Sequence, residues 1–254
     1  GMIGVIIHEV GHNFFPMIIN SDERQWSWMD EGLNTFVEYL TEERWDNKFP
    51  SRRGPAHTIV DYMKLPKEQL EPIMTNSENI IQFGPNAYSK PATGLNILRE
   101  TIVGRELFDK AFKTYSKRWA FKHPEPADFF RTMNDASAEN LDWFWRGWFY
   151  GIDPVDIAID RVIAVKPDLD ANPVAREMSY KIDPPLQNAF EDKSKIINRE
   201  DKKITFYTDE DKETQDFYWR YNRGQEKVDQ NKEYTMKSDD FEKVPQSEKS
   251  KLQN

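Results

Sequence analysis

The chain has 254 residues, a length that accommodates one or two domains. Its formal net charge of -9 argues against nucleic acid as a partner, because nucleic acids favour a basic surface. The absence of cysteine excludes disulfide bonds and cysteine-ligated zinc. No run of about 18 apolar residues occurs, so the sequence predicts no membrane span. Charged residues reach 31% and aromatic residues 13%, which favours a globular core combined with a more polar region.

The first motif of the chain reads His8-Glu9-Val10-Gly11-His12. Histidines four residues apart lie on one face of an α-helix, about one turn from each other, so both imidazoles can reach one ion. Catalytic zinc takes three protein ligands and keeps a fourth position for water. Glu9 lies about 60° around the helix from His12, too far to be a ligand but near enough to take a proton from that water. The motif therefore predicts His8 and His12 as zinc ligands and Glu9 as a general base.

A simpler interpretation of this motif stays open at this point. The pattern fixes only three positions and occurs by chance in unrelated proteins. Apolar residues dominate positions 2–7 and favour a buried helix. In that case the two histidines are hydrogen-bonded core residues and bind no metal.

A second helix is expected from Glu31, nineteen residues after His12. Its buried stripe follows the i, i+3, i+4, i+7 pattern and consists of Leu33, Phe36, Val37 and Leu40. Acidic residues suit the first turn of a helix, and a carboxylate on a helix packed against the first is a suitable third zinc ligand. Glu38, two turns after Glu31 on the same face, is a candidate hydrogen-bond partner for a ligating histidine. An ordinary exposed glutamate at that position is an equal alternative.

The next segments are a loop and isolated histidines. Residues 46–55 are rich in arginine and proline and are expected to form a loop. His57 and His123 have no partner at ligand spacing, so we expect them to be surface or ordinary packed residues. Between them, Tyr88 lies in the short run Ala87-Tyr88-Ser89-Lys90-Pro91, and its residue type alone indicates only a half-buried tyrosine.

Apolar stripes predict further helices at residues 95–102, 108–119 and 141–149, with Gly104 as a stop between the first two. The third stripe is aromatic and consists of Leu141, Phe144, Trp145, Trp148 and Phe149. We interpret it as core and not as a cofactor or carbohydrate platform. Asn140 is expected to cap this helix and Gly151 to end it.

After Gly151 the sequence becomes polar. Alternating apolar residues at 155, 157 and 159 predict a strand. Short strands or a small helix are expected at 204–207 and 217–219. The mixed charges of residues 191–254 indicate a solvated surface, and the last fifteen or so residues are expected to be disordered. We therefore divide the chain into a helical part, 1–150, and a polar extension with short strands, 151–254.

Taken together, the spacing of these motifs resembles one known family. The histidine motif is followed by eighteen residues, then by Glu31 within Trp28-Met29-Asp30-Glu31-Gly32, and 57 positions later by Tyr88-Ser89-Lys90. This pattern is similar to that of the gluzincin zinc aminopeptidases, the alanyl-aminopeptidase family, which also contains leukotriene hydrolase. The resemblance covers roughly residues 1–150.

The resemblance implies a fold and a set of roles. It implies a mainly α structure, the helical lobe of a thermolysin-like (zincin) catalytic domain. It implies that His8, His12 and Glu31 bind zinc, that Glu9 is the base, and that Tyr88 hydrogen-bonds the oxyanion during hydrolysis of peptide substrates.

One departure from the family concerns the region upstream of the zinc motif. A Gly-x-Met-Glu-Asn-like strand, whose glutamate grips the substrate amine, and the amino-terminal β domain precede that motif in the family. Only seven residues precede His8, so we expect a catalytic-domain fragment of a larger enzyme. Two alternatives remain open: a non-catalytic zinc-binding or interaction module that lacks the substrate lobe, and a thermolysin-type endopeptidase. Bacterial periplasm and cytoplasm both remain open as the compartment.

Overall fold

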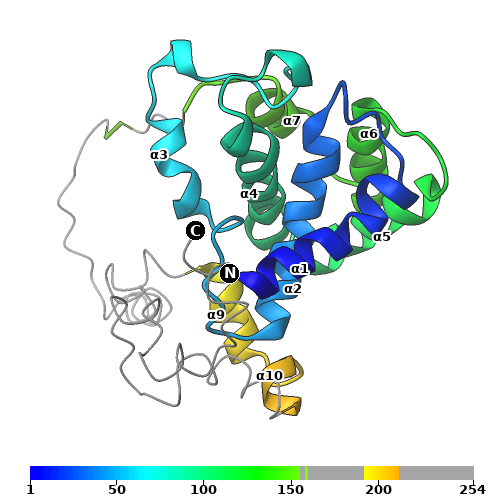
Figure 1. Cartoon of the computed structure of the whole chain (residues 1–254), viewed down its shortest axis with the longest axis vertical. Helices are drawn as coiled ribbons and strands as arrows, with labels where there is room; N and C mark the ends of the chain where they lie inside the picture. Colours follow the sequence, from blue (N-terminus) through cyan, green and yellow to red (C-terminus); the bar gives the residue numbers. More distant parts are fainter. Residues whose placement is uncertain (155–157, 160–191, 212–254) are drawn as a thin grey trace, which may run out of the picture. The chain divides into compact units, whose positions relative to one another are not determined.

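The computed structural model describes residues 1–154, 158–159 and 192–211 (Figure 1). The chain forms two compact units, Gly1–Ile204 and Thr205–Asn254. The described part is mainly α and contains no β-strand, only an isolated parallel bridge between Ile19 and Lys122. The predicted helical fold class is therefore confirmed. No helix in the described ranges combines the length and the apolar character that crossing a membrane requires.

The elements of the first unit follow one another in a nearly continuous helical series. The main helices are α1 (Met2–Gly11), α2 (Leu33–Trp45), α3 (Val60–Met63), α4 (Lys90–Ile97), α5 (Arg105–Trp119), α6 (Pro126–Ser137), α7 (Asp142–Phe149) and α9 (Lys193–Glu200). Shorter helical turns are η1 (Asn13–Ile18), η2 (Trp28–Gly32), η3 (Ala56–Ile59), η4 (Lys67–Gln69), η5 (Ser77–Asn79), η6 (Gly84–Ser89) and η7 (Leu98–Ile102). In the second unit the structure describes α10 (Tyr207–Glu210).

The core lies among α2, α4, α5, α6 and α7 and is strongly aromatic. Trp28 is buried and stacks on Phe130 with ring centroids 5.6 Å apart, and Phe149 meets the same indole edge-on at 4.9 Å. The predicted aromatic stripe of α7 supplies much of this core, because Leu141, Phe144, Trp145 and Phe149 are all buried. Such ring pairs add to the free energy gained by burying their area. The interpretation of the stripe as core is confirmed.

Two glycines and one asparagine lie at the boundaries of helices. Gly104 adopts a φ of 88° between η7 and α5, where an L side chain would be strained. Asn140 accepts a hydrogen bond from the backbone N–H of Asp142 at 3.1 Å, near the start of α7. Gly151 follows the end of α7, as its sequence predicts.

Helix α1 packs against α2 (Figure 1). A Cβ added at Gly11 would lie 2.0 Å from Oδ1 of Asn34, so only glycine permits this approach. Asn34 in turn donates from Nδ2 to the backbone oxygen of His8 at 2.9 Å. The contact fixes the histidine-bearing helix against the helix that follows Glu31.

The apolar run of the first helix is buried only in part, contrary to the core helix of the metal-free alternative. Met2, Val5 and Ile6 are 56, 59 and 53% exposed, whereas Gly4 is buried. The reason is geometric, because α1 contacts α2 along one face only and these three side chains lie on another. An apolar run of this kind predicts a helix, but not which of its faces finds a partner within the chain.

The polar extension contains one helix that the sequence did not indicate. Ser194 and Asn198 of α9 are buried, and Lys195 donates from Nζ to the backbone oxygen of Phe49 at 2.5 Å. The interpretation of this segment as solvated surface is therefore wrong for α9. The strand expected at 155–159 and the segment 217–219 lie mostly or wholly outside the described residues, as does the tail. At 204–207 the structure has the start of α10 and no strand.

Candidate metal centre

His8, His12 and Glu31 converge on one point between α1 and η2. Nε2 of His8 lies 3.1 Å from Nε2 of His12 and 3.2 Å from Oε2 of Glu31. Nε2 of His12 lies 3.4 Å from the same carboxylate oxygen. Among the described residues, this trio is the only group of His, Asp and Glu side chains close enough to share a metal ion.

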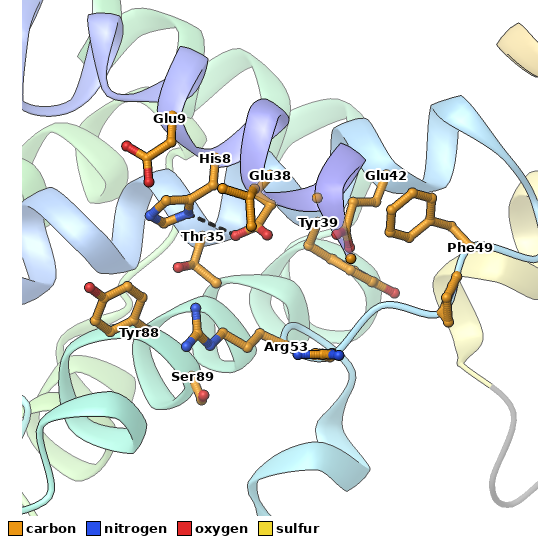
Figure 2. A pocket seen from close by; sticks show the side chains of 15 residues that line it. His8, Glu9, Thr35, Glu38, Tyr39, Glu42, Phe49, Arg53, Tyr88 and Ser89 are labelled. Atoms are coloured by element: carbon orange, nitrogen blue, oxygen red, sulfur yellow. Dashed lines mark hydrogen bonds and ion pairs between the residues drawn. The ribbon is translucent and has the colours of Figure 1, made fainter. Parts of the chain in front are cut away.

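The outer nitrogens of both histidines are held by other groups. Nδ1 of His8 lies 2.9 Å from Oε2 of Glu38, the residue proposed from the helix pattern as a hydrogen-bond partner (Figure 2). Nδ1 of His12 lies 2.8 Å from the backbone oxygen of Phe15, with Oδ1 of Asp30 at 3.0 Å. Because these acceptors require a proton on Nδ1, both neutral imidazoles direct the lone pair of Nε2 inward.

This arrangement fits a zinc ion. When both histidines are neutral, three lone pairs face one another, and a zinc ion between them would remove their repulsion. Zinc bonds of about 2.0–2.2 Å in a tetrahedral site put ligand atoms about 3.3–3.6 Å apart, and the separations of 3.1, 3.2 and 3.4 Å lie within or slightly below this range. Two imidazoles and one carboxylate leave a fourth position free, as in catalytic zinc sites.

The pKa values of His8 and Glu31 are consistent with a role as zinc ligands. The hydrogen bond to Glu31, and then that to Glu38, raise the pKa of His8 to about 9. Burial alone would raise the pKa of Glu31, but hydrogen bonds from His8 and Tyr88 outweigh it and hold that pKa below its usual value. Zinc bound by these three side chains would therefore release a proton from His8.

Tyr88 is held at the edge of the trio by η6. Its hydroxyl donates to Oε1 of Glu31 at 2.6 Å, and its ring stacks on His8 with centroids 5.9 Å apart. Burial, and then the bond to Glu31, raise the pKa of Tyr88 well above its usual value, so the phenol stays protonated and can donate. The guanidinium carbon of Arg53 lies 4.4 Å from the centre of the same ring.

Glu9 lies one position beyond His8 on α1 and is exposed. It lines a cavity of about 580 Å³ that also contains His8, Tyr88 and Arg53 (Figure 2). The structure therefore places a free carboxylate and a phenol at the wall of one cavity that reaches the histidine-bearing face of α1.

Two residues near this centre were not anticipated from the sequence. Asp30 approaches His12, and burial, followed by repulsion from Glu31, raises the pKa of Asp30 to about 7. Arg53 enters the cavity from the segment expected only to be a loop. The position of Asp30 next to Glu31 could have indicated that it lies at the site. No feature of the neighbouring sequence indicated Arg53. His57 and His123 are exposed and lie outside the group.

A pair of histidines four residues apart with a glutamate from a later helical turn is a donor set of the zinc hydrolase class. In agreement with this class, the family described as "Peptidase family M1 domain" matches residues 2–148. The match covers more than half of the chain, so the chain belongs to the peptidase family M1.

Individual relatives carry aminopeptidase names. The chain is 27% identical over 202 residues to glutamyl aminopeptidase of Bitis rhinoceros, covering 72% of this chain and 20% of the snake protein. It is 26% identical over 192 residues to leucine aminopeptidase 2 of Aspergillus fumigatus, covering 67% of this chain and 28% of the fungal protein. Similarity to glutamyl aminopeptidase of Homo sapiens is 25% over 143 residues, or 52% of this chain and 14% of that protein. The chain thus spans a fifth or so of the length of the relatives it matches.

Proposed function

We propose that the protein is a zinc metallopeptidase of the aminopeptidase type, with peptides as substrates. The observation that carries the proposal is the convergence of Nε2 of His8, Nε2 of His12 and Oε2 of Glu31 within 3.4 Å of one another. Membership of the peptidase family M1 and the names of the relatives support the reaction class.

His8, His12 and Glu31 would hold the zinc, which supplies, when bound, a water that ionises near neutral pH and a Lewis acid for the substrate carbonyl. Glu9 accepts a proton from the water that attacks this carbonyl and returns it to the leaving amine. Its exposed carboxylate beside the cavity is free to make this transfer. Glu38 keeps His8 in the orientation and tautomer that binding requires.

Tyr88 stabilises the negative charge that develops on the carbonyl oxygen. The phenol is a protonated donor and its acceptor is now Glu31, at 2.6 Å. When Glu31 is engaged by a metal, the phenol can exchange this acceptor for the substrate. A preorganised donor of this kind contributes about 3 kcal/mol to a transition state.

Two rival functions predict different behaviour. A thermolysin-type endopeptidase shares the histidine motif and a downstream glutamate, but cleaves peptides whose amino terminus is blocked. A non-catalytic zinc-binding module holds the metal and turns over nothing. The spacing of Tyr88 from Glu31 and the names of the relatives favour the aminopeptidase.

The test is a comparison of matched peptides with the full-length protein loaded with zinc. We expect release of the first residue from a free peptide and no cleavage after its amino terminus is acetylated. Glu9→Gln should retain zinc and lose activity, because the glutamate is the base and not a ligand. Cleavage of the acetylated peptide would assign an endopeptidase, and no cleavage of either peptide with zinc bound would assign the non-catalytic module.

A further inference from the structure

Arg53 is a cation at the wall of the candidate active-site cavity. Its guanidinium carbon lies 4.4 Å from the centre of the Tyr88 ring, and that ring lies 5.9 Å from the ring of His8. A single side chain therefore separates the guanidinium from a metal-ligating imidazole. Figure 2 shows Arg53 directed into the cavity beside Tyr88 and Ser89.

No carboxylate neutralises this cation within the described part of the chain. Glu38 and Glu42 line the same cavity, yet neither forms an ion pair with Arg53. Glu38 instead lies 2.9 Å from Nδ1 of His8. Arg53 is half-buried, and within the described residues its guanidinium lies against the face of Tyr88 and donates no hydrogen bond to the chain, so its five N–H donors can serve a planar acceptor.

The loop that carries Arg53 is fixed on both sides of it. Gly54 adopts a φ of 103°, and a Cβ added there would lie 2.4 Å from Cγ of Tyr39, so the backbone lies directly on that ring. Its oxygen accepts a bond from Nδ2 of Asn96 at 3.3 Å. On the other side, Lys195 of α9 donates to the backbone oxygen of Phe49 at 2.5 Å. A cation held in this way loses little further freedom when it binds a ligand.

We propose that Arg53 is a specificity-determining residue that binds a carboxylate of the peptide substrate. The proposal rests on the proposed peptidase function and adds a substrate class to it, namely peptides with a negative charge near the cleaved bond. Extended peptide advances about 3.3–3.6 Å per residue, so a group one to three residues from the metal comes within reach of Arg53. Guanidinium and carboxylate form paired, charge-assisted hydrogen bonds.

Two sources can provide this carboxylate: an acidic side chain, or the carboxyl terminus of a short peptide. Four tripeptides separate them, namely trialanine with a free carboxyl terminus, trialanine amide, and two amides with glutamate at the first or the second position. Their affinities are measured by calorimetry with full-length, zinc-loaded protein that carries Glu9→Gln, which prevents turnover. The same set is then titrated with Arg53→Met, Arg53→Lys and Arg52→Met added.

We expect Arg53→Met to weaken binding of a carboxylate-bearing peptide about tenfold or more while leaving neutral trialanine amide within twofold. The peptide that loses most identifies the source of the carboxylate. Arg53→Lys should recover part of the loss, because the charge remains and the planar fork is gone. Arg52 is the matched comparison, since it is exposed in the same loop and also lines the cavity but lacks the contact with Tyr88. Arg52→Met should therefore weaken binding of the carboxylate-bearing peptides much less than Arg53→Met does.

Three results would overturn the proposal. Equal weakening of all four peptides by Arg53→Met would mean that Arg53 only supports the Tyr88 ring. Equal losses of affinity in the Arg52→Met and Arg53→Met variants would mean a diffuse effect of charge. A carboxylate site would be excluded if the charged peptides did not bind, or if Arg53→Met left their affinities unchanged. Failure of the proposed function is recognised separately, by the zinc content of the protein and by the activity that Glu9→Gln removes.

Discussion

Two polar clusters lie along the same stretch of chain, a half-buried one before and at the middle of α2 and a more deeply buried one near its end. In the first, Glu31 and Glu38 face His8 and His12, and no arginine or lysine joins them in an ion pair among the described residues. We call the second the Glu43 cluster. It consists of two carboxylates, two guanidinium groups and one hydroxyl, from Glu43, Glu100, Arg99, Arg105 and Ser194.

The difference lies in where the positive charge comes from. Glu100 accepts bonds from Arg99 at 2.6 Å and from Arg105 at 2.8 Å, so its charge is compensated within the chain. At the candidate metal centre the inward atoms are all acceptors once the histidines are neutral. A cluster whose carboxylate is paired with two arginines of the chain indicates a structural role, whereas a set of converging acceptors without an arginine or lysine partner in the described residues fits a metal ion. The predictions below test each half of this contrast.

The largest effect is expected on catalysis, from Tyr88→Phe. Removing the hydroxyl should lower kcat of the full-length protein about 10²- to 10³-fold, with zinc content unchanged, because an oxyanion donor is lost and no ligand is. Steady-state kinetics on a free tripeptide measures it. Tyr115→Phe is the matched control, since that hydroxyl is buried in the core and has no hydrogen-bond partner in the described part of the chain. Equal activities of wild type and Tyr88→Phe would remove Tyr88 from the mechanism.

Zinc bound by His8, His12 and Glu31 should stabilise the fold. At a free zinc concentration a thousand times the dissociation constant, the free energy of unfolding should rise by about 4 kcal/mol. Thermal or denaturant unfolding with and without zinc measures the change. His12→Ala should abolish most of the gain, whereas His57→Ala, at an exposed histidine outside the group, should preserve it. Equal stabilisation of both variants would place the zinc elsewhere.

Removing a cation from the Glu43 cluster should destabilise the fold and leave the affinity for zinc unchanged. Arg105→Ala removes a bond of 2.8 Å to the buried Glu100 and one of 2.7 Å to Asn198. Leaving a buried carboxylate short of a partner costs about 3 kcal/mol or more. Denaturant unfolding gives the loss, and zinc affinity at 25 °C should stay within twofold of wild type. A loss of zinc affinity in this variant would mean that the two clusters are coupled.

A smaller effect, of at most about 3 kcal/mol, is expected from pH. Burial raises the pKa of Glu43 from 4.5 to about 7, so the folded chain keeps a proton there that the unfolded chain has released. The free energy of unfolding should therefore fall as pH rises from about 4.5 to 7, because ionisation is less costly in the unfolded chain. Glu43→Gln should remove this contribution from the pH profile of urea unfolding. Parallel profiles for both proteins would contradict the assignment.

Much of the fold could be predicted from the sequence because its signals are local. Apolar spacing in α2 and α7 and the stop at Gly104 depend on neighbours within a few residues, and the helical fold class follows from them. The motif of His8 and His12 is likewise local, and its spacing from Glu31 and Tyr88 is what led to the predicted site. The roles assigned to these residues remain predictions until the experiments above are done.

What could not be predicted depends on contacts between distant residues. Ser194 and Lys195 bind groups of Glu43 and Phe49 about 150 positions away, and the polar sequence of α9 carries no apolar stripe to announce them. Arg53 has no motif around it, and only the folded loop brings it over Tyr88. The apolar run of α1 likewise does not determine which face of that helix is exposed, because a sequence does not state which face of a helix is covered.

The most direct test of the contrast between the two clusters is X-ray absorption spectroscopy of the zinc-loaded chain, with metal content measured on the same sample. We expect one zinc per chain, bound by two imidazoles and by oxygen ligands at about 2.0–2.2 Å. The His12→Ala variant should fall well below one zinc per chain, and Arg105→Ala should keep it. A wild-type chain that takes up no zinc after reconstitution, or whose zinc shows no imidazole scattering, would contradict the account.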